Sequence, residues 1–132
     1  CLEQIASATG IAREARRKMA ASGTPSVLRE KGDDVTAKDV LDAAKAGDAL
    51  ADEVVETASR YLGLVLSQVS MIVDPEVFVI GGGVSKAGQF LVDKVNKYYQ
   101  KYAVISENKG IIALAKLGND AGIYGAARMV LD

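Results

Sequence analysis

The residues best suited to chemistry lie in one short stretch past the middle of the chain. Residues 77–80 are apolar, and the positions that follow are Gly81, Gly82, Gly83, Val84 and Ser85. Glycine loses more conformational freedom on folding than any other residue, so three in a row indicate a turn with positive φ or close approach by a ligand. Backbone amides in such a turn, with the positive end of a following helix, favour an anion such as a phosphate. The stretch therefore predicts a buried strand, a ligand-receiving turn and a helix.

The glycines taken alone leave a second interpretation open, which is an ordinary tight turn. They do not form the Gly-x-Gly-x-x-Gly dinucleotide fingerprint, and no Gly-Lys-Ser/Thr phosphate loop is present. Other features of the chain have to separate the two interpretations.

Composition limits the classes of function. The chain has 132 residues, 49% of them apolar and 5% aromatic, which is typical of one globular, helix-rich domain. Sixteen basic and 17 acidic residues give a net charge of −1, which argues against binding nucleic acid by bulk electrostatics. Residues 61–73 are uncharged but too short for a membrane span of about 20 residues, so we expect a core-facing helix and no membrane partner.

The amino terminus has neither a basic leader nor a signal-type hydrophobic region, and the chain begins with Cys1 rather than methionine. We therefore expect a fragment of a longer cytoplasmic protein. A single cysteine cannot form a disulfide within the chain.

Helical spacing predicts three helices before the glycines. The first covers residues 2–21 and is interrupted or kinked at Gly10; the second begins at a capping box of Thr36 and Asp39 and ends near residue 46. Asp48 caps the third, which ends before Pro75. Its apolar positions step by three and four and predict one buried face: Leu50, Val54, Ala58, Tyr61, Val65, Val69 and Ile72.

A strand, helix, strand, helix order follows. The helix over residues 86–102 carries an apolar side with Leu91, Val95, Tyr98 and Tyr102, and residues 111–117 read as a second buried strand. Asn119 or Asp120 would cap a last helix. Two parallel strands buried on both faces need neighbours, so this α/β pattern predicts a parallel pair that belongs to a larger sheet.

Three segments in order resemble the ROK family of repressors, open reading frames and sugar kinases. Cys1, Leu2 and Glu3, with Ser7, are similar to the end of its zinc and sugar motif, Cys-x-Cys-Gly-x-x-Gly-Cys-x-Glu. Residues 74–85 are similar to its adenosine segment, and residues 120–127, with small Gly122, Gly125 and Ala126, to its hinge helix.

The resemblance implies the two-lobed fold shared with hexokinase and actin. Residues 1–118 would be the carboxy-terminal part of the large lobe, and residues 119–132 a hinge and last helix that return to the missing small lobe. The implied function is that of an ATP-dependent hexose kinase, a glucokinase that phosphorylates the 6-hydroxyl of glucose.

The resemblance also implies roles for individual residues. Gly81, Gly82, Gly83, Val84 and Ser85 would bind the nucleotide, Glu3 would accept hydrogen bonds from sugar hydroxyls, and Cys1 would be a zinc ligand. By residue type alone, Glu3 equally suits a helix dipole and Cys1 a free thiol. ATP and Mg²⁺ are the implied cofactors, with structural Zn²⁺ in the full-length parent only.

No catalytic residue is assigned in this chain. The family's Asp-x-Gly-x-Thr loop, Asn-Asp pair and Glu-x-Gly-His segment have no counterpart, and the sequence contains no histidine. We therefore expect this polypeptide to be inactive by itself. Glucose or a related hexose is the expected ligand, and unpaired sheet edges and an undocked last helix predict a homo-oligomer.

Three alternatives remain. A sugar-responsive ROK repressor keeps the same body; a kinase of the family could act on fructose, mannose or N-acetylmannosamine; and a helical domain could merely pack. The intact glycine turn favours a kinase, because a repressor needs no adenosine site.

Overall fold

The computed structural model describes residues 7–73, 77–80, 88–103 and 111–114 of the chain. In chain order the elements are helix α2 (Ala8–Ala21), the 3-10 turns η1 (Val27–Glu30) and η2 (Gly32–Asp34), helices α3 (Ala37–Lys45) and α4 (Ala49–Val73), strand β1 (Val77–Ile80), helix α5 (Gln89–Tyr102) and strand β2 (Ile111–Leu114).

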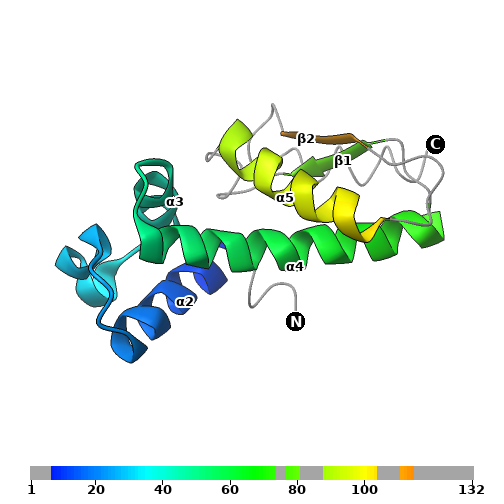
Figure 1. Ribbon diagram of the computed structural model, residues 1–132. Coiled ribbons are helices and arrows are strands. Elements are labelled where there is room, and N and C mark those ends of the chain that lie inside the picture. Colours follow the sequence, from blue (N-terminus) through cyan, green and yellow to red (C-terminus); the bar gives the residue numbers. More distant parts are fainter. Residues whose placement is uncertain (1–6, 74–76, 81–87, 104–110, 115–132) are drawn as a thin grey trace.

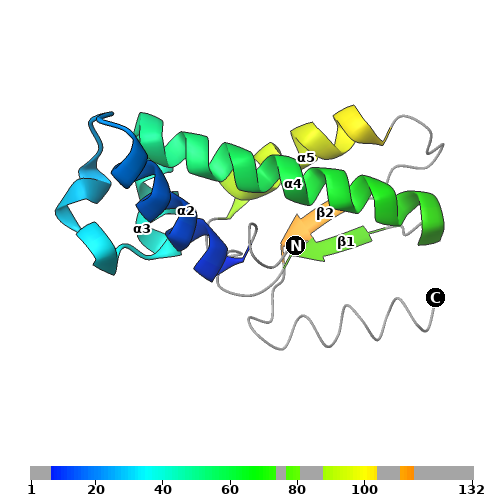
Figure 2. The same cartoon turned by 90° about the horizontal axis from the view of Figure 1, so that it is seen from below.

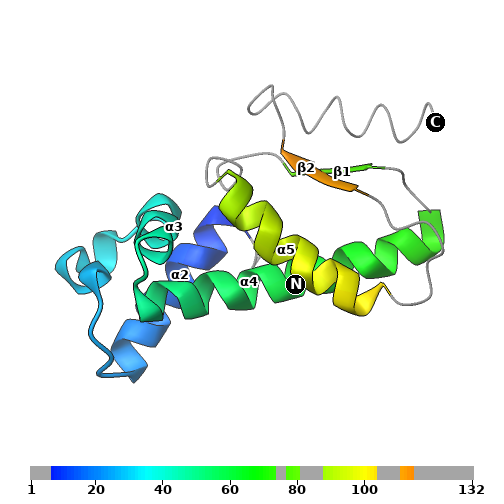
Figure 3. The same ribbon diagram turned by 45° about the horizontal axis from the view of Figure 1, so that its top comes forward.

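Helix α4 is the axis of the molecule. Its 25 residues extend over about 37 Å at 1.5 Å per residue. Helices α2 and α3 pack along its amino-terminal half, while α5 lies along its middle and carboxy-terminal half (Figure 1). Figures 2 and 3 show that α4 and α5 lie to the same side of the strand pair.

Helix α2 begins later than the sequence predicts. Ser7 has an extended backbone, with φ −85° and ψ 165°, and its hydroxyl accepts a hydrogen bond from the Gly10 amide. A residue that caps a helix cannot also continue it. Ser7 is therefore not inside a helix, as the prediction for residues 2–21 required. Gly10 lies in the first turn of α2. Residues 1–6 are outside the described part of the chain.

The predicted caps of the next two helices are confirmed. Thr36 and Asp39 form a capping box, in which the Asp39 amide donates to Thr36 Oγ1 and the Thr36 amide donates to Asp39 Oδ2. Asp48 accepts the Ala51 amide at 2.9 Å and so caps α4. Helix α4 ends at Val73, directly before the predicted stop at residues 74–75.

The Asp48 carboxylate also fixes the segment that connects α2 to α3. It accepts the Ser26 hydroxyl at 2.9 and 3.0 Å and the Val27 amide at 2.9 Å. Partial burial raises the pKa of Asp48, but bonds from the Ala51 and Val27 amides and the Ser26 hydroxyl lower it more, so the pKa lies below its usual value. One charge thus caps α4 and joins it to the start of η1.

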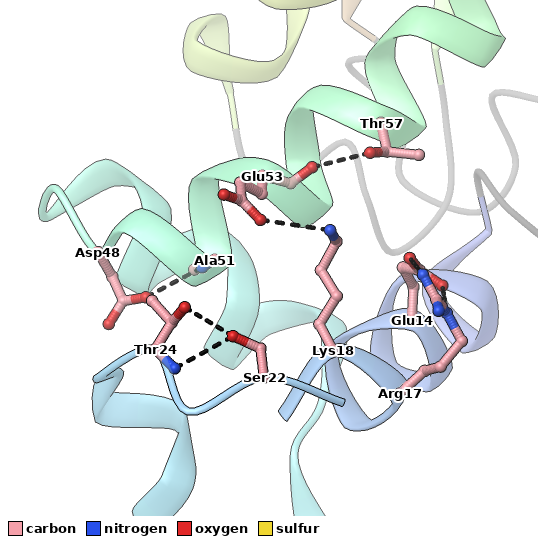
Figure 4. A network of polar contacts seen from close by, with 9 residues as sticks. All are labelled: Glu14, Arg17, Lys18, Ser22, Thr24, Asp48, Ala51, Glu53 and Thr57. Atoms are coloured by element: carbon pink, nitrogen blue, oxygen red, sulfur yellow. Dashed lines mark hydrogen bonds and ion pairs between the residues drawn. The ribbon is translucent and has the colours of Figure 1, made fainter. Parts of the chain in front are cut away.

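Polar contacts near its carboxyl end link α2 to α4 and to the segment that follows α2 (Figure 4). Lys18 Nζ lies 3.3 Å from Glu53 Oε2, and the Ser22 hydroxyl and the Thr24 hydroxyl share a hydrogen bond of 2.7 Å. The Arg29 guanidinium donates to the carbonyls of Met19 and Ser22, which stand at the end of the helix. Surface contacts of this kind fix geometry and contribute little stability each.

The predicted apolar face of α4 is correct for only half of the helix. Leu50, Val54 and Ala58 are buried against α2 and α3. Beyond them the same stripe is only partly covered: Tyr61 and Ile72 are exposed, Val65 is half-buried, and Val69 is half-buried against the core. Residues 61–73 are thus helical and face the core as expected, but they do so through the buried residues Gly63, Ser67 and Ser70, with Leu62, Leu66 and Val69 partly buried, rather than through the whole predicted stripe.

Small residues form the side of α4 that receives α5: Ser59, Gly63, Ser67 and Ser70, all of them buried. The Ser67 and Ser70 hydroxyls donate to the carbonyls of Leu64 and Ser67, at 2.6 and 2.8 Å. Because these hydroxyls bond to their own helix, they can be buried without a partner on α5.

Helix α5 faces this side with Leu91, Val92, Val95 and Tyr99, which are all buried. The predicted burial of Leu91 and Val95 is correct. Tyr98 and Tyr102, predicted on the same side, are only half-buried, and Tyr99 is the tyrosine buried in the core. The adjacent tyrosines could not be separated by spacing alone. Residues 86 and 87 of the predicted helix lie outside the described part.

Strands β1 and β2 are parallel, and their residues pair without offset from Val77 with Ile111 to Ile80 with Leu114. Helix α5 connects them and packs against β2, where Ile112 is buried. The described part of the second strand ends at Leu114, and residues 115–117 of the predicted strand lie outside it.

We predict that Gly63→Ala destabilises the protein. A Cβ at position 63 would lie 2.6 Å from Tyr98 Cβ and 2.8 Å from the Tyr99 amide nitrogen, so the α5 backbone would have to move. Overpacking costs about 1–3 kcal/mol and exceeds the roughly 1 kcal/mol that alanine gains in helix propensity. The free energy of unfolding, measured in urea, should fall by about 1–2 kcal/mol.

Gly23→Ala is the matched control, because a Cβ there would meet nothing within 4 Å. It should leave the free energy of unfolding unchanged or slightly raised. Equal effects of the two substitutions would show that the close approach at Gly63 is not a constraint.

Candidate functional site

The strand pair defines the edge where the candidate site lies. Because β1 and β2 are parallel and aligned, Ile80 and Leu114 end side by side at the same edge. The segments that follow both strands therefore leave the sheet from neighbouring points. In open parallel sheets, ligands bind at the carboxyl ends of the strands.

The predicted nucleotide residues follow β1 immediately. Gly81, Gly82, Gly83, Val84 and Ser85 come directly after Ile80, but they lie outside the described residues, as do Cys1 and Glu3. The structure thus gives the edge from which the glycines start and does not place them relative to Glu3 or Cys1. Their roles stay predictions.

The amino terminus of α5 is suited to an anion. Its N-cap is Gly88, with φ +69°, and this residue supplies no side-chain acceptor to the first turn. The first turn contains no acidic residue of its own that would offset the positive end of the helix dipole. Both features suit a phosphate group near this helix end.

A charged cluster fixes α5 on α4. Lys94 Nζ lies 3.0 Å from Asp52 Oδ1 and 2.8 Å from Glu56 Oε2, and Lys97 Nζ lies 2.7 Å from Glu56 Oε1. The Tyr98 hydroxyl also donates to Glu56. Glu56 therefore joins successive turns of α5 to one position on α4.

This cluster determines the ionisation of Glu56. Partial burial raises its pKa, but bonds from the two ammonium groups and the tyrosine hydroxyl lower it more, to about 2. Burial also lowers the pKa of Lys94, yet its two carboxylate partners outweigh that effect and raise it above its usual value. The charged forms of Glu56 and Lys94 stabilise each other.

Sequence reasoning missed Glu56 and Gly63, although signals for both exist. Asp52 and Glu56 are four apart on α4, and Lys94 and Lys97 are three apart on α5, so each pair lies on one side of its helix. Gly63 belongs to a run of small residues at helical spacing. These signals indicate a helix contact only once the two helices are known to be neighbours.

The described residues contain no group of three or more acidic, cysteine or histidine side chains able to hold a metal ion. In the same part of the chain, no helix is long and apolar enough to cross a membrane.

Comparison with known proteins identifies the family. A family model described as the ROK family matches residues 1–132. A glucokinase from Halalkalibacterium halodurans is 41% identical over 133 residues, a match that covers 98% of this chain and 40% of that protein. The chain belongs to the ROK family.

Solved structures agree with this assignment. A ROK family glucokinase from Streptomyces griseus, in complex with glucose and AMPPNP, has a TM-score of 0.82 and 29% identity, covering 98% of this chain and 44% of that one. A ROK family transcriptional regulator, a homolog of the Escherichia coli Mlc protein, has a TM-score of 0.79 and 27% identity, covering 98% and 32%. The chain thus spans less than half the length of these relatives.

We predict that Glu56 contributes pH-dependent stability. A carboxylate with a lowered pKa stabilises the fold above its unfolded pKa of 4.5, and this contribution is lost as the pH falls toward about 2. After allowance for solvent screening, Glu56→Gln should cost roughly 1–2 kcal/mol at pH 7. The difference between wild type and variant should shrink between pH 4.5 and 2 in urea unfolding.

Glu53→Gln serves as the control on the same helix. Glu53 is largely exposed and forms one 3.3 Å ion pair with Lys18. Its replacement should change the free energy of unfolding by less than about 0.5 kcal/mol at any pH in the range. A Glu56→Gln variant with the same small, flat profile would contradict a stabilising role for the cluster.

Proposed function

We propose that this chain is the carboxy-terminal part of an ATP-dependent hexose kinase, a glucokinase that phosphorylates the 6-hydroxyl of glucose. The observation that carries the proposal is the position of the three glycines, which follow β1 at the edge where β1 and β2 both end. A nucleotide at this edge would meet backbone amides without side chains between them.

The relatives support the substrate classes. The Halalkalibacterium halodurans relative is named a glucokinase, and the Streptomyces griseus neighbour holds glucose and the ATP analogue AMPPNP. By this proposal residues 1–118 belong to the large lobe of a two-lobed, hexokinase-like kinase, in which β1 and β2 extend a larger sheet. Residues 119–132 form its hinge and last helix, and the enzyme works in the cytoplasm.

The proposal divides binding among a few residues. Gly81, Gly82 and Gly83, with Val84 and Ser85, would bind the nucleoside and ribose; the chain continues from them to α5, whose N-cap Gly88 supplies no side-chain acceptor. Glu3 accepts hydrogen bonds from adjacent sugar hydroxyls, so a sugar without them leaves its charge unpaired. ATP brings Mg²⁺, which neutralises charge on the phosphates.

The zinc site cannot be completed by this chain. A structural zinc ion takes four ligands, usually thiolates and imidazoles, and the chain offers Cys1 as its single cysteine and no histidine. Cys1 is therefore proposed as one ligand of a site that needs residues from elsewhere.

The second candidate is the sugar-binding body of a ROK repressor. The regulator related to Mlc covers the same 98% of this chain with a similar TM-score of 0.79, so the fold does not separate the two functions. The uninterrupted glycines favour the kinase, because a regulator without nucleotide chemistry has no use for them.

We predict that the 132-residue chain binds AMPPNP but does not phosphorylate glucose. Isothermal titration should show AMPPNP binding, and Gly82→Val should weaken it at least ~10-fold, because a branched side chain occupies the space of the nucleoside. Gly23→Val, in a loop where a Cβ meets nothing within 4 Å, is the matched control and should bind as wild type does.

The result separates the two candidates. AMPPNP binding that depends on Gly82 supports the kinase. Glucose binding without AMPPNP binding would support the repressor, and glucose phosphorylation by this chain alone would refute the assignment of catalysis to residues outside it.

A further inference from the structure

Lys94 connects α4 with the first turn of α5. Its ammonium group lies 3.0 Å from Asp52 Oδ1 and 2.8 Å from Glu56 Oε2, both on α4. The same ammonium group lies over the ring of Phe90, at 5.3 Å from the ring centroid. Phe90 is the second residue of α5, and its side chain packs against the hydrophobic core. One cation thus joins the start of α5 to two carboxylates of the neighbouring helix.

The surroundings of Lys94 differ from those of Lys97, the second lysine of the cluster. The Lys94 side chain is 19% exposed, so its contacts are better protected from water than those of an ordinary surface lysine. Lys97 is 64% exposed, and besides Glu56 it contacts the ring of Tyr98, more than two turns after Phe90. Of these two lysines, Lys94 is therefore the one that acts on the start of the helix.

The proposed nucleotide residues lie in sequence between two fixed points of the fold. Residues 81–87 connect Ile80, the last residue of β1, to Gly88, the N-cap of α5. Both strand arrows point toward the end of the molecule at which α5 begins (Figure 2). The position of β1 sets one end of this segment and the first turn of α5 sets the other. A shift of that first turn therefore moves one end of the glycine segment.

The first turn of α5 also orients backbone donors at this place. The amides of Leu91 and Val92 both donate to the Gly88 carbonyl, at 3.2 and 3.4 Å. The amides before them, at Gln89 and Phe90, occupy positions that have no acceptor within their own helix. Burial of Leu91 and Val92 and the contact of the Phe90 ring with Lys94 hold this turn in place. A group that fixes Phe90 therefore also sets the direction of these donors.

We propose that Lys94 is a positioning residue for the nucleotide: through Phe90 it fixes the first turn of α5 and so raises the affinity of the glycine segment for ATP. This inference rests on the proposed nucleotide site at residues 81–85. Lys94 acts by holding the helix start in the conformation that binds, and a segment that is ordered before binding loses less conformational freedom when its ligand arrives.

Lys94→Met in the 132-residue chain tests the proposal. Isothermal titration with AMPPNP should give a dissociation constant ~5- to 20-fold above that of the wild type, because the first turn of α5 must then be ordered on binding. Lys94→Arg should restore most of the affinity, since a guanidinium group can pair with carboxylates and stack on an aromatic ring.

Lys18→Met is the matched control for the loss of a lysine that holds a helix on α4. Lys18 joins α2 to α4 by its 3.3 Å ion pair with Glu53, and its side chain is 24% exposed, close to the value for Lys94. Because Lys18 lies on α2, its replacement should leave the dissociation constant for AMPPNP unchanged. A loss of affinity equal to that of Lys94→Met would show a general loss of stability and would overturn the positioning role.

A double-mutant cycle tests the route through Phe90. Phe90→Leu keeps an apolar side chain in the core but removes the ring under the ammonium group, so it should weaken AMPPNP binding by itself. Adding Lys94→Met to Phe90→Leu should weaken binding little further, because residues that act as one unit are not additive. Lys97→Met, which removes a Glu56 contact and leaves Phe90 in place, should change the dissociation constant less than about 2-fold.

Hydrogen exchange without nucleotide gives a second readout, which does not depend on binding. In Lys94→Met the amides of Leu91 and Val92, which close the first turn of α5, should exchange faster than in the wild type. The amides of Val54 and Val55, in the buried first half of α4, should exchange as before. Unchanged exchange at Leu91 and Val92 would contradict a role of Lys94 in fixing this turn.

The titrations separate failure of this inference from failure of the proposed function. A wild-type chain that does not bind AMPPNP would overturn the nucleotide site, and the inference with it. Wild-type binding that Lys94→Met leaves unchanged would overturn the inference alone. Additive losses in Lys94→Met and Phe90→Leu would exclude the route through Phe90.

Discussion

The close approach of α5 to α4 at Gly63 is the constraint on which the rest of the arrangement depends. A side chain at this position would occupy the space of Tyr98 Cβ and the Tyr99 amide. With α5 seated there, Glu56 reaches the two lysines of α5, and the helix in turn carries β2. Close packing at Gly63 therefore contributes to the position of the strand pair, although Gly63 lies on a helix that precedes both strands.

Local signals in the sequence were sufficient for the start of α3 and for both ends of α4, but not for the start of α2 or for the helix contacts. The capping box at Thr36, the cap at Asp48 and the stop after Val73 all depend on neighbouring residues, and the structure has them. The buried face of α4 was predicted as far as Ala58 but not beyond it, because the apolar stripe continues past the point where α2 and α3 end. The buried side there carries serine and glycine, and these residue types do not by themselves indicate burial.

The candidate site shows the same division between local and distant information. The glycines predict a turn after a strand, and the strand is present at Val77–Ile80. That β1 and β2 end at one edge depends on pairing between segments separated by the whole of α5. Glu56 lay outside the predicted site because an acidic residue acquires its role only from the helix placed opposite.

The order of elements along the chain also bears on how the protein reaches this fold during synthesis. Helices α2, α3 and the first half of α4 are contiguous and bury one another, so contacts such as those of Leu50 and Val54 require only short loops to close. Helix α5 leaves the ribosome later, and until then the serine side of α4 faces water. The Ser67 and Ser70 hydroxyls, bonded to their own helix, make that side tolerant of both surroundings. A row of leucines in the same place would also exclude water from the final contact. Until α5 packed on it, however, it would expose an apolar surface that promotes aggregation.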